Sequence, residues 1–248
     1  MKRVLFKHRS IRKFRSAPIP EEVLRECLEA ATRASTCGNM QLYSLVVTRD
    51  RALREQLAPC HFNQPMVVEA PCVVTVCVDV HRFSMWCSQR DAEPAYDNFA
   101  WFLNGATDAL LAAQNFCVQA EMQGLGICYL GTTIYTAGDI ARILALPQGV
   151  IPLTTIVVGY PDETPELTDR LPLDAVVHFE KYTDYTAAEI DELWAEKEAS
   201  PLTARLLEEN GLPNLAQIFT LRRYVREDNL AISRSYLALL RERGFFNQ

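Results

Sequence analysis

Three cations and a hydroxyl stand together near the start of the chain. Residues 8–14 read His-Arg-Ser-Ile-Arg-Lys-Phe, which places Arg9, Arg12 and Lys13 beside the hydroxyl of Ser10. Guanidinium and hydroxyl groups are good donors to a phosphate. A second turn at residues 168–172 carries Arg170. Because the formal net charge is -6, two isolated basic sites favour a small anionic ligand over nucleic acid. The alternative is a solvated N-terminal arm.

Composition limits the classes of protein to consider. The 248 residues are 49% hydrophobic, which is enough for one sizeable core. Acidity argues against a nucleic-acid or membrane partner, and charged residues interrupt every candidate spanning stretch. Residues 1–7 lack the apolar segment of a signal peptide, so we expect a cytoplasmic protein.

Cysteines and histidines give no metal-site spacing. Eight cysteines occur without a Cys-x-x-Cys pair, and most lie in apolar runs, so we expect free thiols in a reducing cytoplasm. Cys37 differs because it lies in a polar loop. The four histidines stand far apart at positions 8, 61, 81 and 178. We therefore expect no metal site.

Apolar runs and turn residues predict strands that alternate with helices. Residues 71–79 are almost continuously apolar over the length of a strand, which predicts a central strand buried on both faces. This alternation is typical of a layered α/β or α+β fold. Further strands are expected at 43–48, 127–130 and 153–159, and helices at 18–33, at 50–57 and from residue 136 onward.

The longest regular element is a helix predicted over residues 97–123. Its apolar positions cover a wide arc, which suits a core-crossing helix or a dimer interface. After residue 182 the pattern becomes wholly helical, beginning with a capping box at Thr186 and Glu189. The segment has little core of its own. We expect it to pack on the main domain or on a partner subunit.

Five segments occur in order along the chain at residues 8–12, 34–41, 63–64, 129–131 and 169–172. In this order they resemble the nitroreductase family, and their spacing looks most like its NADPH-dependent flavin and nitro reductase branch. The resemblance spans roughly residues 3–182. It implies a three-layer α-β-α fold of the α+β class, with a mixed central sheet flanked by helices and a helical C-terminal arm. The implied domains are an FMN-binding domain at 1–182 and an extension at 183–248.

The resemblance also implies roles around a non-covalent FMN. The candidates to bind the FMN phosphate are His8, Arg9, Ser10 and Arg170. Arg12 would face the pyrimidine edge of the flavin, where negative charge develops on reduction. The backbone N–H of Gly131 or Thr132, in the loop after Tyr129 and Leu130, would face flavin N5. Other polar contacts to the ring or ribityl chain would come from Ser35, Asn39, Gln41 and Gln64. No catalytic side chain is expected, because the cofactor carries the reaction.

Two departures from the branch bear on these roles. Thr168-Asp169-Arg170 stands where the branch often has Lys-Pro-Arg, so one phosphate cation is missing. Gly131-Thr132 stands where the branch often has two glycines, so the backbone there is less free.

The implied function is an FMN oxidoreductase that transfers hydride from NADPH or NADH to nitroaromatic, quinone or flavin acceptors by ping-pong turnover. The implied assembly is a homodimer with both chains contributing to each FMN site. Two alternatives remain open: a flavin dehalogenase or desaturase on the same scaffold, and a non-catalytic flavin-binding protein. Cations of the tail could reach the 2′-phosphate of NADPH or could form a solvated helix face; they are Arg205, Arg222, Arg223 and Arg226.

Overall fold

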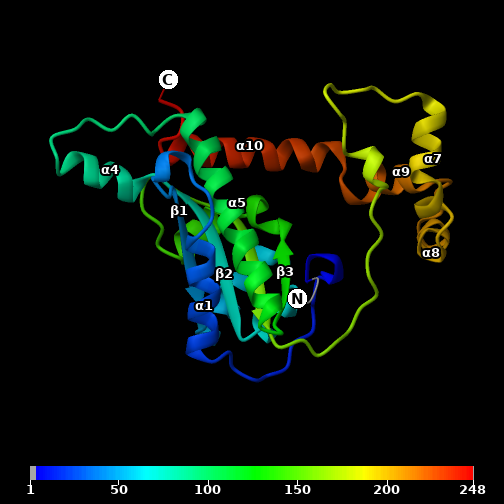
Figure 1. Cartoon of the computed structure of the whole chain (residues 1–248), viewed down its shortest axis with the longest axis horizontal. Helices are drawn as coiled ribbons and strands as arrows, with labels where there is room; N and C mark the ends of the chain where they lie inside the picture. The colour runs from blue at the N-terminus through cyan, green and yellow to red at the C-terminus, as the bar shows by residue number, and fades with distance from the viewer. Residues whose placement is uncertain (1–3, 248) are drawn as a thin grey trace. The chain divides into compact units, whose positions relative to one another are not determined.

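The chain forms two compact units in the computed structural model, which describes residues 4–247. The first unit combines the chain up to Leu167 with the segment from Ile232 onward, and the second is Thr168–Ala231 (Figure 1). The domains expected from the sequence, 1–182 and 183–248, divide the chain elsewhere, and their outermost residues 1–3 and 248 lie outside the described part. The last segment belongs to the first unit because its apolar side chains Leu239, Leu240 and Phe245 are buried in that unit's core.

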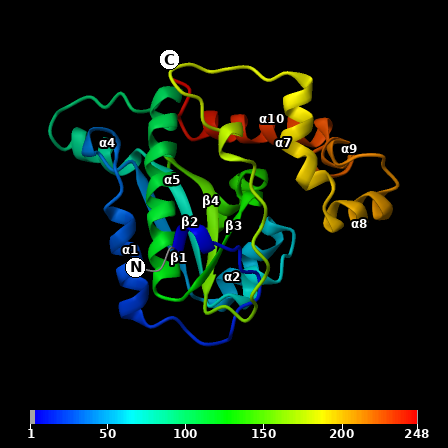
Figure 2. The ribbon, with the colours of Figure 1, turned by 45° about the vertical axis from the view of Figure 1, so that its right-hand side comes forward.

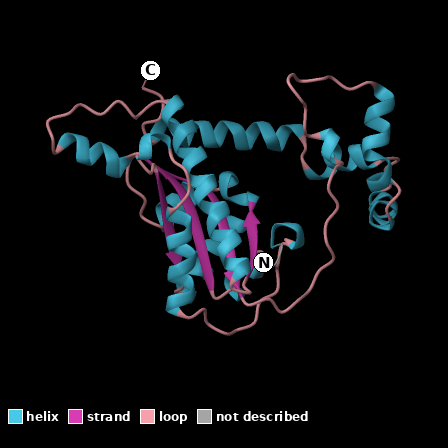
Figure 3. Cartoon of the chain, in the orientation of Figure 1, coloured by secondary structure: helices cyan, strands magenta, loops and turns pink. Residues whose placement is uncertain are grey.

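One four-stranded sheet lies within the described part of the chain, in the first unit (Figure 3). The strand order is β1-β2-β4-β3, and every neighbouring pair is antiparallel. The expected mixed sheet is thus corrected to an antiparallel one. Buried apolar runs predict strands but not their direction, which the connections decide. Among described residues, parallel pairing is limited to an isolated bridge between Ser10 and Ile127. The strands are β1 (Tyr43–Thr48), β2 (Cys72–Asp79), β3 (Gly126–Leu130) and β4 (Val150–Gly159).

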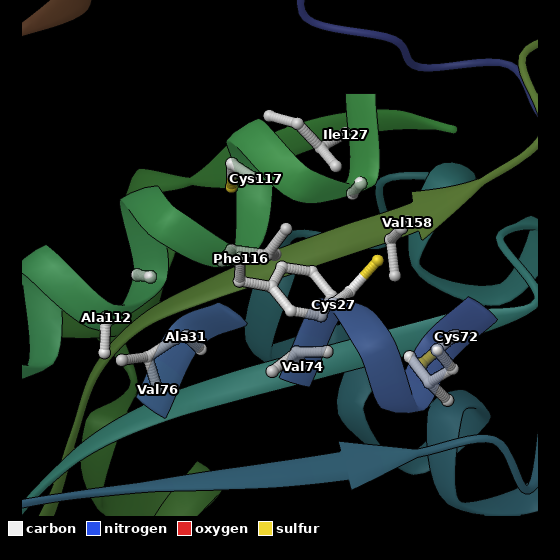
Figure 4. Close-up of a cluster of buried hydrophobic side chains, with 14 of the residues drawn as sticks. Cys27, Ala31, Cys72, Val74, Val76, Ala112, Phe116, Cys117, Ile127 and Val158 are labelled. Atoms are coloured by element: carbon white, nitrogen blue, oxygen red, sulfur yellow. The ribbon is translucent and has the colours of Figure 1, made fainter. Parts of the chain in front are cut away.

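Helices cover both faces of this sheet, so the three-layer α+β fold is confirmed. Helices α1 (Glu21–Thr32) and α5 (Phe99–Met122) pack on one face, where Phe116 lies among strand valines (Figure 4). The other face carries shorter helices, with α2 on the opposite side of the strands from α1 and α5 (Figure 2). Those helices are α2 (Arg51–Leu57), the 3-10 helix η3 (Ala58–His61), α3 (Met66–Glu69) and α6 (Ala137–Ile143).

Strand β2 shows why both faces must be covered. All eight of its residues are buried, as its continuous apolar run predicts. Val74 and Val76 contact the layer of α1 and α5, whereas Val73 contacts the layer of α3 and α6. Because successive side chains of a strand point to opposite faces, a strand buried at every position needs a covering layer on each side.

Helix α5 is the central scaffold of the first unit. The Asn98 side chain caps its start by accepting a hydrogen bond from the Trp101 N–H. Gly105 lies so close to β2 that a Cβ there would be 2.6 Å from Val78 Cγ1. The remaining elements of this unit are η1 (Val4–Lys7), η2 (Cys37–Asn39), α4 (His81–Ser88) and η4 (Gly131–Tyr135).

The second unit contains helices and loops. The predicted capping box at Thr186 is present, with the Glu189 side chain and the Thr186 hydroxyl bonding each other's backbone N–H. Helix α10 (Arg226–Glu242) begins in this unit and ends in the first. The other elements are η5 (Leu173–Ala175), α7 (Ala187–Glu198), α8 (Pro201–Asn210), α9 (Leu215–Ile218) and η6 (Phe219–Arg223).

Two kinds of feature are absent from residues 4–247. No helix there combines the length and the apolar character needed to cross a bilayer. No group of three or more His, Cys, Asp or Glu side chains there is arranged to hold a metal ion.

Candidate functional site

The basic opening is anchored along the edge of the sheet rather than extended into solvent. The Ile11 N–H donates to the Ile127 carbonyl at 2.9 Å, and Ile11 and Phe14 are both buried. A Cβ at Gly126 would lie 2.5 Å from Ile11 Cγ1, so glycine is needed there for close approach. The anchoring makes the run of cations a fixed feature of the first unit.

The two arginines of this run differ in their surroundings. Arg9 Nη1 donates to the Lys7 carbonyl at 3.3 Å, whereas its Nε is buried and has no hydrogen-bond partner among the described residues. Arg12 is exposed, and its backbone N–H donates to Glu163 Oε1 at 2.5 Å. Glu163 therefore fixes the backbone and leaves the Arg12 guanidinium at the surface.

His8 points toward α5. Its Nδ1 lies 2.6 Å from Glu121 Oε1, and the side chain of Glu121 is mostly buried. A hollow of about 260 Å³ borders this pair, and its lining includes the cations Lys7 and Arg9 as well as the acids Glu121 and Glu163. Only part of the expected phosphate site is therefore free of nearby carboxylates. Ser10 lies on the same strand-like segment, where its hydroxyl contacts the thiol of Cys128.

The polar loop at residues 34–42 is held by a carboxylate from α5. Asp108 is almost fully buried, and its two oxygens accept hydrogen bonds from the backbone N–H groups of Cys37 (2.8 Å) and Leu42 (3.1 Å). Between these bonds, Asn39 and Gln41 both have φ of 55°. This left-handed conformation is uncommon for residues other than glycine and must be held by its surroundings.

Arg82 holds the same loop from its carbonyl side. Its Nη2 donates to the Gln41 carbonyl at 2.5 Å and to the Tyr43 carbonyl at 3.0 Å. Asp79 orients Arg82 by accepting from its backbone N–H at 3.1 Å. The expected ligand-binding side chains of this loop are thus presented at the surface by a rigid backbone; they are Ser35, Asn39 and Gln41.

The loop after β3 is held by uncharged groups. The Thr133 hydroxyl donates to the Leu130 carbonyl at 2.9 Å, and the Thr136 hydroxyl donates to the Cys60 carbonyl at 2.7 Å. The hydroxyl of Thr132 lies 2.8 Å from Nδ1 of His61. Gly131 is exposed, and a Cβ there would meet no atom within 4 Å. The backbone at Gly131 therefore faces open space.

Residues at the end of β3 face the interior. Leu130 is buried in the layer of α3 and α6, and the ring of Tyr129 packs in the layer of α1 and α5. Burial raises the pKa of the Tyr129 phenol, and the neighbouring Cys117 raises it further. These two side chains pack in the core, so any contact to a ligand would come from their backbone.

Gln64 lies one short turn beyond His61. Its backbone N–H donates to the His61 carbonyl at 3.1 Å, and its side chain is half-buried. The intervening Phe62 and Asn63 have φ of 55° and 53°. The contact between His61 and Thr132 therefore links the turn that precedes Gln64 to the loop that follows residues 129–131. The pairing of Ser10 with Ile127 brings the basic opening to the same strand.

Arg170 belongs to the second unit. Its Nη1 donates to the Thr168 hydroxyl at 2.6 Å and to the Asp169 carbonyl at 2.8 Å. The Asp169 carboxylate pairs with Lys197 at 3.0 Å. The acid next to Arg170 in sequence is therefore neutralised by another cation.

The four tail arginines also lie in the second unit and are exposed. Arg205 pairs with Glu209 one helical turn away at 3.7 Å, and the Arg223 guanidinium lies 5.6 Å from the ring centre of Phe219. Arg222 lies in the last turn of η6, and Arg226 begins α10.

Three side chains that organise these loops were not predicted from the sequence: Asp108, Arg82 and His61. Asp108 carried a signal, because it is a lone acid in a stretch of α5 that otherwise contains only uncharged residues. Arg82 and His61 carried none, since each acts on a backbone or hydroxyl group far along the chain. Burial lowers the pKa of His61 to about 4, so its imidazole is neutral at pH 7.

Comparisons with known proteins agree on one family. The model of the nitroreductase family matches residues 5–160. An NADPH-dependent oxidoreductase of Staphylococcus aureus (strain MRSA252) is 37% identical over 180 residues, which is 71% of each chain. A crystal structure of a Bacteroides fragilis NCTC 9343 protein is 49% identical, with a TM-score of 0.97 over 98% of this chain and 99% of that one. The NADPH:FMN oxidoreductase of Vibrio harveyi, solved with NAD+, is 27% identical, with a TM-score of 0.82 over 99% and 98%.

Proposed function

Because the chain belongs to the nitroreductase family, we propose that it is an FMN-dependent oxidoreductase that uses NAD(P)H. The observation that carries the proposal is the junction at β3. There the Ile11 N–H bonds Ile127 and attaches the basic opening to β3, and the contact of His61 with Thr132 links the turn before Gln64 to the loop at Gly131. These are three of the five segments that the family resemblance assigns to FMN.

The residues present fit such a cofactor. A buried Arg9 Nε that has no partner among described residues would gain one from a phosphate oxygen. The open space at Gly131 leaves room for a planar ring to approach the backbone. We assign phosphate binding to Arg9, Ser10 and Arg170, with His8 contributing from its pair with Glu121. The remaining proposed contacts are Arg12 at the pyrimidine edge, Gln64, Ser35, Asn39 and Gln41 at polar atoms, and the backbone of residues 129–132.

When bound, FMN would accept hydride from NAD(P)H and pass it to a nitroaromatic, quinone or flavin acceptor by ping-pong turnover. The protein's part is to bind, orient and tune. An exposed guanidinium such as Arg12 stabilises negative charge placed beside it. A fixed backbone N–H at residue 131 or 132 would orient the flavin ring by donating a hydrogen bond to its N5 atom.

Ping-pong turnover has a kinetic signature that tests the proposal. Steady-state rates should be measured with NADPH and NADH against a nitrofuran, a quinone and free flavin. We expect parallel lines in double-reciprocal plots, because donor and acceptor use one site in turn. Intersecting lines would contradict ping-pong turnover. A flavin-loaded protein inactive with every acceptor would favour a dehalogenase, a desaturase or a non-catalytic flavin-binding protein.

A homodimer is the second part of the proposal. Leu103, Leu110 and Leu111 on α5 are 44–50% exposed, which is unusual for three large apolar side chains on the central helix of a core. A second copy of the chain would cover them, and the family resemblance implies that both chains contribute residues to each FMN site. Light scattering should give about twice 28.1 kDa, and a monomer that retains FMN would contradict this.

Arg9 and Arg170 give a direct test of the phosphate assignment. Replacing either by alanine should weaken FMN binding by about 1.5–3 kcal/mol, the usual contribution of a charge-assisted hydrogen bond. Fluorescence titration of the apoprotein measures the effect. Lys197→Ala should be titrated beside them, because Lys197 pairs with Asp169, the residue next to Arg170. If both arginine variants bind FMN like the parent protein, the phosphate site lies elsewhere.

Two finer assignments remain proposals. One of Arg205, Arg222, Arg223 and Arg226 would favour NADPH over NADH by facing its 2′-phosphate. An exposed cation contributes on the order of 1 kcal/mol, so its removal should raise KM for NADPH severalfold and leave KM for NADH unchanged. A reducing location such as the cytoplasm would suit eight cysteines that are all free.

A further inference from the structure

His61 is a buried imidazole that the proposed function leaves without a role. Its side chain is fully buried at the end of η3, and its Nδ1 lies 2.8 Å from the Thr132 hydroxyl. Its Nε2 is buried and has no partner among the described residues. Burial lowers its pKa to about 4, so the ring is neutral at pH 7 and offers one donor and one acceptor. Among the described residues, the contact with Thr132 is thus the hydrogen bond that holds the His61 ring.

Thr132 stands at the position where the loop after β3 meets open space. It is half-buried, between the exposed Gly131 and the buried Thr133. Because His61 is fully buried, a hydroxyl bonded to it is directed into the protein. A β-branched side chain has few χ1 rotamers, so fixing its hydroxyl also restricts the peptide that carries it. Thr132 is also one of the two departures from the nitroreductase pattern.

We propose that His61 is a positioning residue for Thr132, and that it fixes the backbone N–H of Thr132 toward flavin N5. The proposal rests on the proposed FMN site. Thr132 brings a side chain where glycine would leave the backbone free, and His61 holds that side chain inward and away from the open space at Gly131.

The proposal predicts a sign for the flavin potential. Oxidised flavin accepts a hydrogen bond at N5, whereas reduced flavin carries a proton there and cannot accept one. A fixed N–H donor therefore favours the oxidised form and lowers the midpoint potential. Loosening Thr132 should raise the potential, a change that a merely structural contact would not produce.

The experiment compares four single variants, and one double variant of His61→Phe with Thr132→Val, for FMN affinity and for midpoint potential by dye equilibration. His61→Phe and Thr132→Val each remove the bond, and Thr132→Ser keeps the hydroxyl. Thr136→Val is the matched control, because it removes a threonine hydroxyl bonded to the Cys60 carbonyl, one residue from His61, and has no assigned FMN contact. Since the fully buried His61 could be hard to replace, the Thr132 variants test the bond from its half-buried end.

We expect His61→Phe and Thr132→Val each to weaken FMN binding roughly threefold to tenfold, the range that one hydrogen bond spans. Both should raise the midpoint potential, and the double variant should change little beyond either single one. Thr132→Ser should resemble the parent protein, and Thr136→Val should lower the Tm without moving the potential.

Two outcomes would overturn the proposal, and they are distinguishable. If the parent binds FMN but Thr132→Val leaves affinity and potential unchanged, His61 has no positioning role and the proposed function stands. If the parent binds no FMN, both proposals fail together. A shift in potential equal in Thr136→Val and Thr132→Val would also overturn it, because the effect would then follow general loosening of the loop.

Discussion

The loop at residues 34–42 and the loop at residues 131–136 are held by different chemistry. The first depends on charged side chains: Asp108 accepts two backbone N–H groups, and Arg82 donates to two carbonyls. The second depends on uncharged side chains, with Thr132, Thr133 and Thr136 each bonding a different neighbour. Both loops present polar or open backbone where the proposed site needs it.

The difference predicts which change should destabilise each loop most. A single buried carboxylate that satisfies two N–H groups concentrates the stabilisation in one residue, and its loss leaves both groups without an acceptor. Three hydroxyls spread the stabilisation, so each alone matters little. We therefore expect the first loop to be sensitive to one substitution and the second to be sensitive to pH, through His61.

Asp108→Leu should give the largest effect on the free energy of unfolding. The leucine fills the volume but leaves the Cys37 and Leu42 N–H groups unsatisfied, which costs about 3–5 kcal/mol for the pair. Urea denaturation measures it. Asp108→Asn should lose less, because its amide oxygen still accepts one N–H.

Asp139→Asn is the matched control for that prediction. Asp139 is an exposed carboxylate paired with Arg142 at 3.0 Å, and such pairs contribute about 0–1 kcal/mol. If Asp108→Leu were no more costly than Asp139→Asn, the account of the first loop would be wrong.

Acid should weaken the second loop through His61, the next largest effect. Burial lowers the pKa of His61 from 6.5 to about 4, so below pH 6.5 the unfolded chain binds the proton more readily than the folded one. This contribution to stability is complete above pH 6.5 and is lost as the pH falls toward 4. The loss reaches about 3 kcal/mol.

The control for the acid effect is His61→Phe, which cannot titrate. Urea midpoints measured from pH 7 to pH 4 should fall less steeply in this variant than in the parent protein. Equal slopes would show that other groups carry the acid sensitivity.

Thr133→Val should have a smaller effect, about 1–2 kcal/mol. The Thr133 hydroxyl bonds the Leu130 carbonyl and the Thr155 hydroxyl, both at 2.9 Å, and valine keeps the shape while leaving these partners buried. A loss as large as that of Asp108→Leu would remove the contrast between the loops. Thermal unfolding measures the loss, and Thr136→Val, measured beside it, shows how much stability is lost when a single hydroxyl is removed.

Arg82→Lys should be the mildest change, about 0.5–1 kcal/mol. Lysine keeps the charge but lacks the planar fork that reaches the Gln41 and Tyr43 carbonyls together. Chemical denaturation at two salt concentrations should show a loss that persists in salt, because it reflects geometry. A loss that vanishes in high salt would indicate that only the charge mattered.

Sequence patterns predicted most of the framework and few of its anchors. The buried run of β2, the long α5 and the capping box of α7 were readable because periodicity and caps are local properties. Strand direction was not local, and the mixed sheet was wrong. The side chains that hold the loops were not predicted for the same reason. Asp108 bonds Leu42 and Cys37, which lie 66 and 71 positions away in the sequence, and His61 contacts Thr132, 71 positions later.

The predicted boundary of the C-terminal extension differs from the division seen in the structure for a related reason. The helical pattern after residue 182 predicted one arm, yet Leu239, Leu240 and Phe245 are buried with Leu42 and Val78 of the first unit. An amphipathic helix reveals that it has an apolar face but not which surface covers that face.

Anaerobic reduction of the reconstituted protein tests the central claim most directly. Protein equilibrated with FMN and freed of excess ligand should release one FMN per protomer on heat denaturation, identified by chromatography. Before denaturation, NADPH or NADH should bleach the flavin band, and a nitrofuran should restore it. Retention of no flavin, release of FAD, or a flavin band that neither nucleotide bleaches would contradict the account.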